Sequence, residues 1–374
     1  MTTTGDSRFT SDVYASRVSR AAQLTADAGF DALVVSPGPD LRYLTGSRAN
    51  TFERLTALVI PASGTPRIVV ARLEVPSLKA SAVGDLGIEV CDWVDGQDAY
   101  ALALDGLGAR PRLAVSDAMP ALHVVPIAQR SSATPALATA VLRELRMIKD
   151  TSEIDALREA GAAIDRVHAR MGEWLRVGRT EREVAADIAD AIVSEGHTGA
   201  EFVIVGSGPN GADPHHEYSD RTITADDVVV IDIGGPVEPG YNSDSTRTYS
   251  FAEPSGEIAD AYAALQSAQQ QAVAAVRPGV TAESVDAAAR DVLRGAGLAE
   301  KFIHRTGHGI GLSVHEEPYI VAGNDIELRS GMAFSVEPGV YFSGQWGARI
   351  EDIVVVTDDG CEALNTRPHG LTVL

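Results

Sequence analysis

The spacing of apolar and polar positions predicts a mixture of helices and strands from the beginning of the chain. Apolar and alanine positions at helical spacing predict a helix over residues 11–29. Short apolar runs at 32–36, 55–61 and 67–71 are typical of strands, and the turn residues at 62–66 predict a hairpin between the last two. The first part of the chain is therefore expected to form a mixed α/β unit.

A Ser/Thr/Pro-rich stretch at 131–135 marks a boundary between two regions. We expect an N-terminal α/β domain over residues 1–135 and a second domain over residues 141–374. The second domain begins with a long helical pattern, for which Ser152 and Asp155 provide a capping-box spacing.

The second region contains a faint internal repeat. Gly178 corresponds to Gly279, and Thr180 to Thr281, always at the same separation. In both copies a Gly-x-Thr segment leads into an alanine-rich amphipathic helix, and a β-rich stretch follows. Gly-x-Thr is also a common helix start, but the matched helix lengths favour a true repeat. Two related halves facing each other would leave a cleft between them.

Two aspartates lie in segments that the sequence predicts to be strands. Asp232 interrupts the run Val228–Gly235, and Asp244 lies in a Thr-rich and Tyr-rich segment after the loop 236–240. A buried carboxylate is costly unless it is paired or bound to a metal. Either residue alone would more often be a cap or turn residue. Antiparallel strands joined by this loop would bring both carboxylates to one place.

One histidine and two glutamates extend this pattern towards the end of the chain. His308 lies between Gly307 and Gly309, whereas Glu337 and Glu351 each adjoin apolar strand-like runs. A lone histidine is usually a hydrogen-bonded core residue, and one buried acid could form an ion pair. Several such residues together indicate a shared cation. The predicted metal ligands are Asp232, Asp244, His308, Glu337 and Glu351.

This ligand set consists mostly of hard oxygen donors, with one nitrogen and no thiolate. Such a set favours Mn²⁺ or Co²⁺, and it also accommodates Zn²⁺ or Fe²⁺. Two divalent ions roughly 3.5–4 Å apart would share a water, lower its pKa and polarise a carbonyl. The five residues therefore predict a hydrolase with two divalent metal ions.

The composition narrows the function classes. The chain has 374 residues, a net charge of −21 and two cysteines. A strongly acidic chain repels phosphates and anionic lipids, so we expect no binding to nucleic acid or membranes. No apolar run approaches the roughly 20 residues needed to cross a bilayer, and residues 1–10 lack a signal-peptide core. We therefore expect a cytoplasmic protein without a disulfide framework.

At these residues the chain resembles the pita-bread metallopeptidases (family M24), the group of methionine aminopeptidase, aminopeptidase P and prolidase. The resemblance covers essentially the whole chain, and it assigns the four acids and the histidine above to the family's metal ligands. It implies an α/β (α+β) fold: a pseudo-twofold pita-bread catalytic domain, preceded by a smaller creatinase/prolidase-type N-terminal domain. The pseudo-twofold fold would account for the internal repeat.

The same resemblance implies roles for further residues. His215 matches a family histidine that contacts the substrate near the scissile bond, and His304 and His315 match a pair near its proline side. Arg349 matches an arginine beside the last ligand. His216 stands where many relatives have glycine; we choose His215 for the site because a proline precedes it.

The N-terminal domain and the complete ligand set favour the prolidase and aminopeptidase P branch. The segment Leu41–Gly46 resembles a motif of that domain. The expected enzyme hydrolyses an Xaa-Pro bond, with Glu337 accepting the proton and relaying it to the leaving nitrogen. The short first domain leans towards an Xaa-Pro dipeptidase over an Xaa-Pro aminopeptidase, and a non-peptidase of this fold is the third alternative. The resemblance also implies a homodimer, in which the N-terminal domain helps to close the partner's site.

Overall fold

The computed structural model describes residues 9–50 and 53–374. The chain divides between Arg146 and Met147 into two compact units, which are described separately. Both units combine helices and sheets, so the expected α/β class is confirmed. None of the helices within the described ranges is long and apolar enough to span a membrane.

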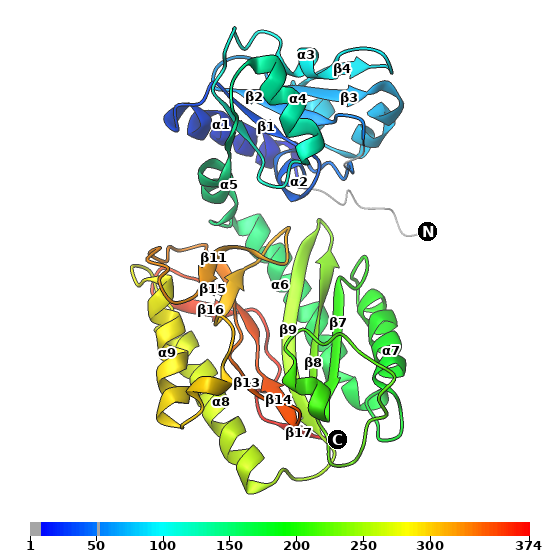
Figure 1. The fold of residues 1–374 in the computed structure, drawn as a ribbon, viewed down its shortest axis with the longest axis vertical. Coiled ribbons are helices and arrows are strands. Elements are labelled where there is room, and N and C mark those ends of the chain that lie inside the picture. The colour runs from blue at the N-terminus through cyan, green and yellow to red at the C-terminus, as the bar shows by residue number, and fades with distance from the viewer. Residues whose placement is uncertain (1–8, 51–52) are drawn as a thin grey trace. The chain divides into compact units, whose positions relative to one another are not determined.

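The first unit is built around a mixed six-stranded sheet with helices packed on it (Figure 1). The strand order is β4-β3-β2-β1-β5-β6, and its core includes Val34, Val59, Val69 and Ile127. The strands are β1 (Ala32–Val35), β2 (Ala57–Pro61), β3 (Arg67–Ala71), β4 (Glu89–Trp93), β5 (Leu113–Val115) and β6 (Ala136–Leu137). The helices are α1 (Ser11–Asp27), α2 (Pro39–Thr45), α3 (Ala99–Leu104), α4 (Ala121–Ser131) and α5 (Thr139–Arg146).

The hairpin predicted at residues 62–66 is confirmed, because β2 and β3 are antiparallel neighbours with Leu58 opposite Ile68. The Leu41–Gly46 motif forms most of α2 and its C-terminal cap. Gly46 has φ 70°, and a Cβ there would lie 2.8 Å from the Tyr14 hydroxyl. Only glycine combines a positive φ with the absence of a Cβ that would collide with Tyr14. Gly46 therefore ends α2 at this position.

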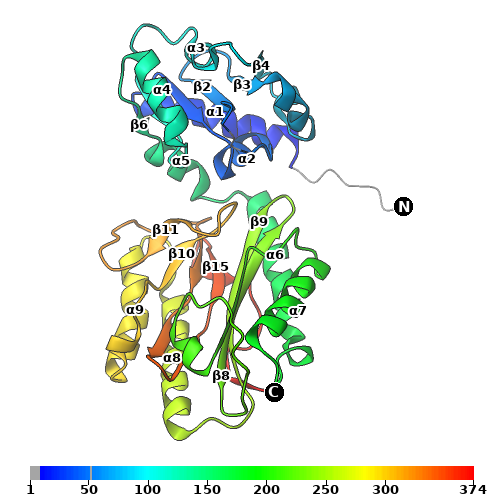
Figure 2. The same cartoon turned by 45° about the vertical axis from the view of Figure 1, so that its right-hand side comes forward.

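The second unit has two helix pairs on its outer sides and strands between them, as Figures 1 and 2 show. One pair, α6 (Thr151–Ala169) and α7 (Glu181–Ser194), packs on a sheet of order β17-β9-β8-β7. The other pair, α8 (Gly256–Ala275) and α9 (Ala282–Gly295), packs on strands of a sheet of order β11-β10-β12-β15-β16 and on the hairpin β13-β14.

The strands of the first sheet are β7 (Phe202–Ser207), β8 (Val228–Val237), β9 (Tyr241–Ser250) and β17 (Thr372–Val373). Those of the second are β10 (Gly307–Gly309), β11 (Glu316–Ile320), β12 (Ala333–Val336), β15 (Asp352–Val356) and β16 (Cys361–Ala363). The separate hairpin consists of β13 (Gly339–Phe342) and β14 (Trp346–Arg349).

The internal repeat corresponds to two similar halves of the second unit. Helices α7 and α9 have equal lengths, and each starts directly after its threonine, Thr180 or Thr281. Each threonine also makes an isolated antiparallel bridge, Thr180 with Thr222 and Thr281 with Glu327. The repeat seen in the sequence is therefore a repeat of structure, and the pita-bread arrangement is confirmed.

The cap predicted for α6 was placed two residues too late. Asp150, not Ser152, caps the helix: its side chain accepts from the Glu153 amide at 2.9 Å. The Glu153 carboxylate in turn accepts from the Asp150 amide at 3.0 Å. Both pairs have the capping-box spacing, so the sequence pattern alone does not separate them.

Candidate metal centre and substrate pocket

The two aspartates lie on one hairpin, β8–β9, as the strand pattern predicts. Asp232 is opposite Thr246 and Asp244 is opposite Gly234. Directly opposed residues of antiparallel strands share a face, and so do residues two apart on one strand. Asp232, Asp244 and Thr246 therefore project from the same face of the sheet, and all three are buried.

The other three side chains come from the second half of the unit. His308 lies in β10, Glu337 directly follows β12, and Glu351 lies between β14 and β15. Strand β9 reaches across to this half: the Thr246 hydroxyl donates to Glu351 Oε2 at 2.7 Å, and the Glu351 amide donates to the Thr246 carbonyl at 3.2 Å. The site is thus assembled where the two halves meet.

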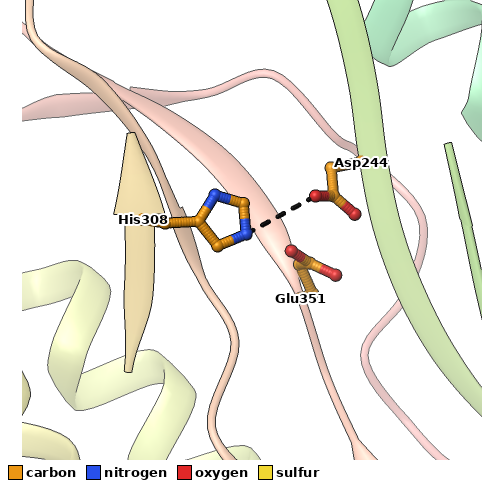
Figure 3. A group of neighbouring side chains, drawn as sticks. All are labelled: Asp244, His308 and Glu351. Atoms are coloured by element: carbon orange, nitrogen blue, oxygen red, sulfur yellow. Dashed lines mark ion pairs between the residues drawn. The ribbon is translucent and has the colours of Figure 1, made fainter. Parts of the chain in front are cut away.

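Three of the side chains form a compact group. Asp244, His308 and Glu351 each offer a ligand atom, and these atoms lie within 4.8 Å of one another. In Figure 3 the imidazole and both carboxylates converge from three different strands or loops. His308 Nε2 lies 3.6 Å from Asp244 Oδ2 and 3.2 Å from Glu337 Oε1, so Glu337 adjoins the same group.

One carboxylate oxygen of Asp232 is buried without a hydrogen-bond partner among the described residues. Its Oδ2 accepts from Arg349 Nη2 at 2.6 Å, whereas its Oδ1 is buried and has no hydrogen-bond partner among the described residues. Buried carboxylate oxygens normally have partners, because desolvation without one is costly. Four acids share this site with one arginine, so the residues fit a group that supplies further positive charge.

Burial governs the protonation of these groups in the protein alone. It raises the pKa of Glu337 to about 7, with Asp232 adding to the rise against the opposing charge of Arg349. Burial and neighbouring carboxylates also raise the pKa values of Asp244 and Glu351. Burial lowers the pKa of His308 to about 3, so its imidazole is neutral and can donate a lone pair to a metal.

Metal removal is therefore expected to make stability strongly pH-dependent. A carboxyl whose pKa is raised on folding loses stability as pH rises from its unfolded value, about 4.5, through its folded value, about 7 for Glu337. We expect the chelated protein to melt several degrees lower at pH 8 than at pH 5.5. Divalent metal should remove most of this difference; equal melting temperatures of the chelated protein at both pH values would contradict the expectation.

A cavity of about 800 Å³ opens onto this group of side chains. It is large enough for a small peptide, since typical ligand pockets span roughly 300–1,000 Å³. All five predicted ligands line it, together with every histidine and the arginine assigned to the site. These further lining residues are His215, His304, His315 and Arg349.

His304 is held on both of its ring nitrogens by the protein. Nδ1 lies 2.7 Å from the Arg305 carbonyl, which can only accept, so Nδ1 carries the proton. Nε2 then accepts from the Tyr341 hydroxyl at 2.8 Å. Burial lowers the pKa of His304 to about 3, assisted by the charge of Arg349. The His304 ring is therefore neutral where it lines the cavity.

Tyr341 connects this histidine to the metal group. Its hydroxyl accepts from Arg349 Nη1 at 2.7 Å, and the same guanidinium binds Asp232 and Thr246 Oγ1. Arg349 is buried, and each of its three guanidinium nitrogens donates to one of these neighbours. The sequence pattern did not single out Tyr341 for the site, and nothing in the local spacing marks it.

Two further supporting residues could have been found from strand alternation. Ser335 lies two residues before Glu337, and its hydroxyl donates to Glu337 Oε1 at 3.0 Å while accepting from the His308 amide. Thr246 lies two residues after Asp244 and contacts Glu351. Positions two apart share a strand face, so both hydroxyls were predictable neighbours of the acids.

The remaining histidines differ in their surroundings. His315 packs edge-on against His308, with ring centroids 4.1 Å apart. His215 lines the cavity, whereas the adjacent His216 contacts Glu181 at 2.8 Å. Of the two adjacent histidines, His215 therefore lines the pocket, and His216 does not.

Fold and site together define a two-domain metallopeptidase, and similarity to known proteins agrees. Residues 155–358 match metallopeptidase family M24, and residues 17–148 match the creatinase/prolidase N-terminal domain. The chain belongs to metallopeptidase family M24. Enzymes of this family depend on a dinuclear metal centre, and Asp244, His308 and Glu351 form a group that could hold a metal ion.

Individual relatives cover the chain over nearly its full length. "Probable dipeptidase PepE" of Mycobacterium tuberculosis is 64% identical over 371 residues, which is 99% of both proteins. An "Xaa-Pro dipeptidase" of Lactobacillus helveticus is 34% identical over 362 residues, covering 94% of this chain and 97% of the relative. The crystal structure of dipeptidase PepE from Mycobacterium ulcerans has a TM-score of 0.95 at 65% identity, covering 98% of this chain and 99% of that one.

Proposed function

We propose that this enzyme hydrolyses the Xaa-Pro peptide bond, principally in dipeptides. The observation that carries the proposal is one cavity lined by the four predicted acidic ligands, His308 and three further histidines. The names of the dipeptidase and Xaa-Pro dipeptidase relatives support the same substrate class.

Asp232, Asp244, His308, Glu337 and Glu351 would hold two divalent ions, with Mn²⁺ or Co²⁺ preferred for this oxygen-rich set. Such ions, when bound, lower the pKa of a water and polarise a carbonyl. The partly unsatisfied Asp232 and the convergence of Asp244, His308 and Glu351 support this ligand assignment.

The chain's own groups handle the proton and the substrate. Glu337 lies at the cavity wall with Oε1 held by Ser335, a fixed position from which it takes a proton and passes it to the proline nitrogen. His215 and His315 line the same cavity and supply donors for the oxyanion that develops at the scissile carbonyl. His304 and Arg349, whose donors are engaged by the protein, shape the pocket and orient Asp232.

An Xaa-Pro bond has no amide N–H, so strand-like recognition of the peptide fails at that bond. A dedicated cavity with polar groups on fixed strands avoids this problem. Most of the groups proposed here stand on strands or directly beside them, which keeps the proline end and the scissile carbonyl in a constant relation.

Substrate length provides the decisive experiment. We expect kcat/KM for Xaa-Pro dipeptides to exceed that for Xaa-Pro-containing tri- and tetrapeptides at least about tenfold. The free carboxylate of a dipeptide makes charge-assisted hydrogen bonds that a neutral amide cannot replace, a difference worth about 1.5–3 kcal/mol. Steady-state kinetics with Ala-Pro, Ala-Pro-Ala and Ala-Pro-Ala-Ala, and Ala-Ala as control, measure this.

Other outcomes identify the alternatives. Equal or faster cleavage of the longer peptides would make the enzyme an Xaa-Pro aminopeptidase. Absence of Xaa-Pro cleavage, combined with no bound or activating divalent ion, would indicate a non-peptidase of the same fold.

The assembly and location remain proposals based on family membership. We propose a homodimer in which the N-terminal domain helps to close the partner's site, and a cytoplasmic location. Sedimentation analysis of the purified chain and cell fractionation would test these two points.

A further inference from the structure

One buried carboxylate outside the metal group, that of Glu181, contacts the loop that carries His215. Glu181 is the first residue of α7, and it is completely buried. A carboxylate at a helix N-terminus interacts favourably with the free amides and the helix dipole. None of the steps proposed above uses this residue.

The Glu181 carboxylate accepts hydrogen bonds from both ends of one loop. The loop 207–219 runs from the end of β7 through the short helix Gly208–Ala212 towards β8. Oε1 accepts from the Ser207 amide at 2.8 Å, the Ser207 hydroxyl at 2.6 Å and Asn210 Nδ2 at 3.0 Å. Oε2 accepts from Asn210 Nδ2 at 3.1 Å, the Ser219 amide at 2.9 Å and the Ser219 hydroxyl at 2.7 Å.

The middle of the loop is held by His216. Its Nε2 lies 2.8 Å from Glu181 Oε2, and its side chain is only 20% exposed. The acceptor is a carboxylate hydrogen-bonded by several other donors, so Nε2 donates the proton. The beginning, middle and end of the loop thus converge on the same two oxygens.

These bonds keep Glu181 ionised. Burial alone would raise its pKa, but the hydrogen bonds from Ser207, His216 and Ser219 outweigh burial and lower it. An ionised carboxylate accepts at both oxygens, and every partner here is a donor. Charge-assisted bonds of this kind are the stronger class, so the loop has one favoured conformation.

His215 lies in the same loop, next to the residue that contacts Glu181. It immediately precedes His216 and lines the cavity together with Pro214. Its own side chain is exposed, and the only hydrogen bond recorded for it within the described residues joins its backbone amide to Asp213 Oδ1 at 3.1 Å. The position of the backbone that carries His215 therefore depends on how the neighbouring residues of the loop are held.

We propose that Glu181 is a positioning residue of the peptidase: through His216 and the ends of the 207–219 loop, it holds His215 against the substrate cavity. The inference rests on the proposed function, in which His215 contacts the scissile carbonyl. Holding the loop at Glu181 would fix the backbone from which the His215 side chain reaches the cavity.

Two substitutions test this contact. In Glu181→Gln, one oxygen becomes an amide group that faces donors, and the backbone amides of Ser207 and Ser219 cannot turn away. In His216→Ala, only the bond from the middle of the loop is lost. Because small misplacements of catalytic groups are costly, we expect kcat/KM for Ala-Pro to fall roughly 100-fold and roughly tenfold, respectively. His216→Ala keeps the test open if Glu181→Gln does not fold.

A double-mutant cycle separates positioning from a general structural role. If His216 acts through His215, His216→Ala should lower kcat/KM less than about twofold when His215 is already alanine. Arg182→Ala is the matched control, because Arg182 also joins α7 to this chain segment through Asp220, at 2.7 Å, but outside the cavity. That variant should keep its activity. Equal effects of His216→Ala with and without His215 would overturn the inference.

A readout without catalysis separates this inference from the proposed function. The imidazole NMR signal of His215 is identified by its disappearance in His215→Ala. It should shift or broaden in His216→Ala and remain in place in Arg182→Ala. An unchanged His215 signal would overturn the positioning role, even in an active enzyme. A displaced signal in a protein that cleaves no Xaa-Pro peptide would support positioning and refute the proposed reaction. Full activity of His215→Ala would leave no reacting group to position and would also overturn it.

Discussion

Replacing Asp244 with alanine is expected to lower kcat/KM for Xaa-Pro dipeptides at least roughly 1,000-fold. Asp244 belongs to the group whose ligand atoms lie within 4.8 Å of one another, and it adjoins His308 at 3.6 Å. Metal polarisation supplies several kcal/mol of transition-state stabilisation, and about 4 kcal/mol corresponds to a factor of about 1,000. Steady-state kinetics at saturating Mn²⁺, with metal content measured in parallel, test this expectation.

Two further variants serve as a test of the charge of Asp244 and as a control. Asp244→Asn keeps the shape of the side chain but removes its charge, so it should lose most of the activity as well. Asp226→Ala removes an exposed carboxylate from the turn before β8 and should behave like the unchanged enzyme. Substantial metal-dependent turnover in Asp244→Ala would refute the ligand assignment.

The second large effect concerns stability. Arg349→Met is expected to reduce the free energy of unfolding by about 3–5 kcal/mol, the cost of removing one partner from a buried charge pair. The guanidinium is buried, donates to Asp232 at 2.6 Å and also holds Tyr341 and Thr246. Methionine approximates the volume of the side chain, so the loss reflects charge and hydrogen bonds more than a cavity.

Metal should reduce the loss in Arg349→Met, because divalent ions compensate the same carboxylates. Denaturant unfolding with chelator and with excess Mn²⁺ measures both values, and the loss should be larger with chelator. Arg158→Met, which removes a half-exposed pair with Glu362 at 2.8 Å, is the control and should cost at most about 1 kcal/mol. Equal small losses in both variants would contradict the role assigned to Arg349.

Much of the site could be predicted because its acids break an apolar strand pattern. Asp232, Glu337 and Glu351 stand out in the sequence for that reason. Asp244 lies in a polar, Thr-rich segment, and the β8–β9 hairpin brings it to the same face as Asp232. The chain reversal between them was also visible, from Pro and Gly in the connecting loop. The structure places all five predicted ligands on one cavity, although their metal-binding roles remain predictions.

What could not be predicted depends on contacts between distant segments. Neither the bond of Tyr341 to His304 and Arg349 nor the bond of His216 to Glu181 leaves a local signature. The preference for Asp150 over Ser152 as the cap of α6 also escaped the pattern, because two overlapping pairs satisfy the same spacing. Tertiary packing decides such cases.

The bridge between Thr246 and Glu351 joins the first half of the second unit to the predicted ligand that comes last in the chain. The proposed ligands extend from Asp232 to Glu351, so the proposed centre is complete only when both halves have been synthesised and folded. We therefore expect a proteolytic nick that separates the two halves to abolish the activity.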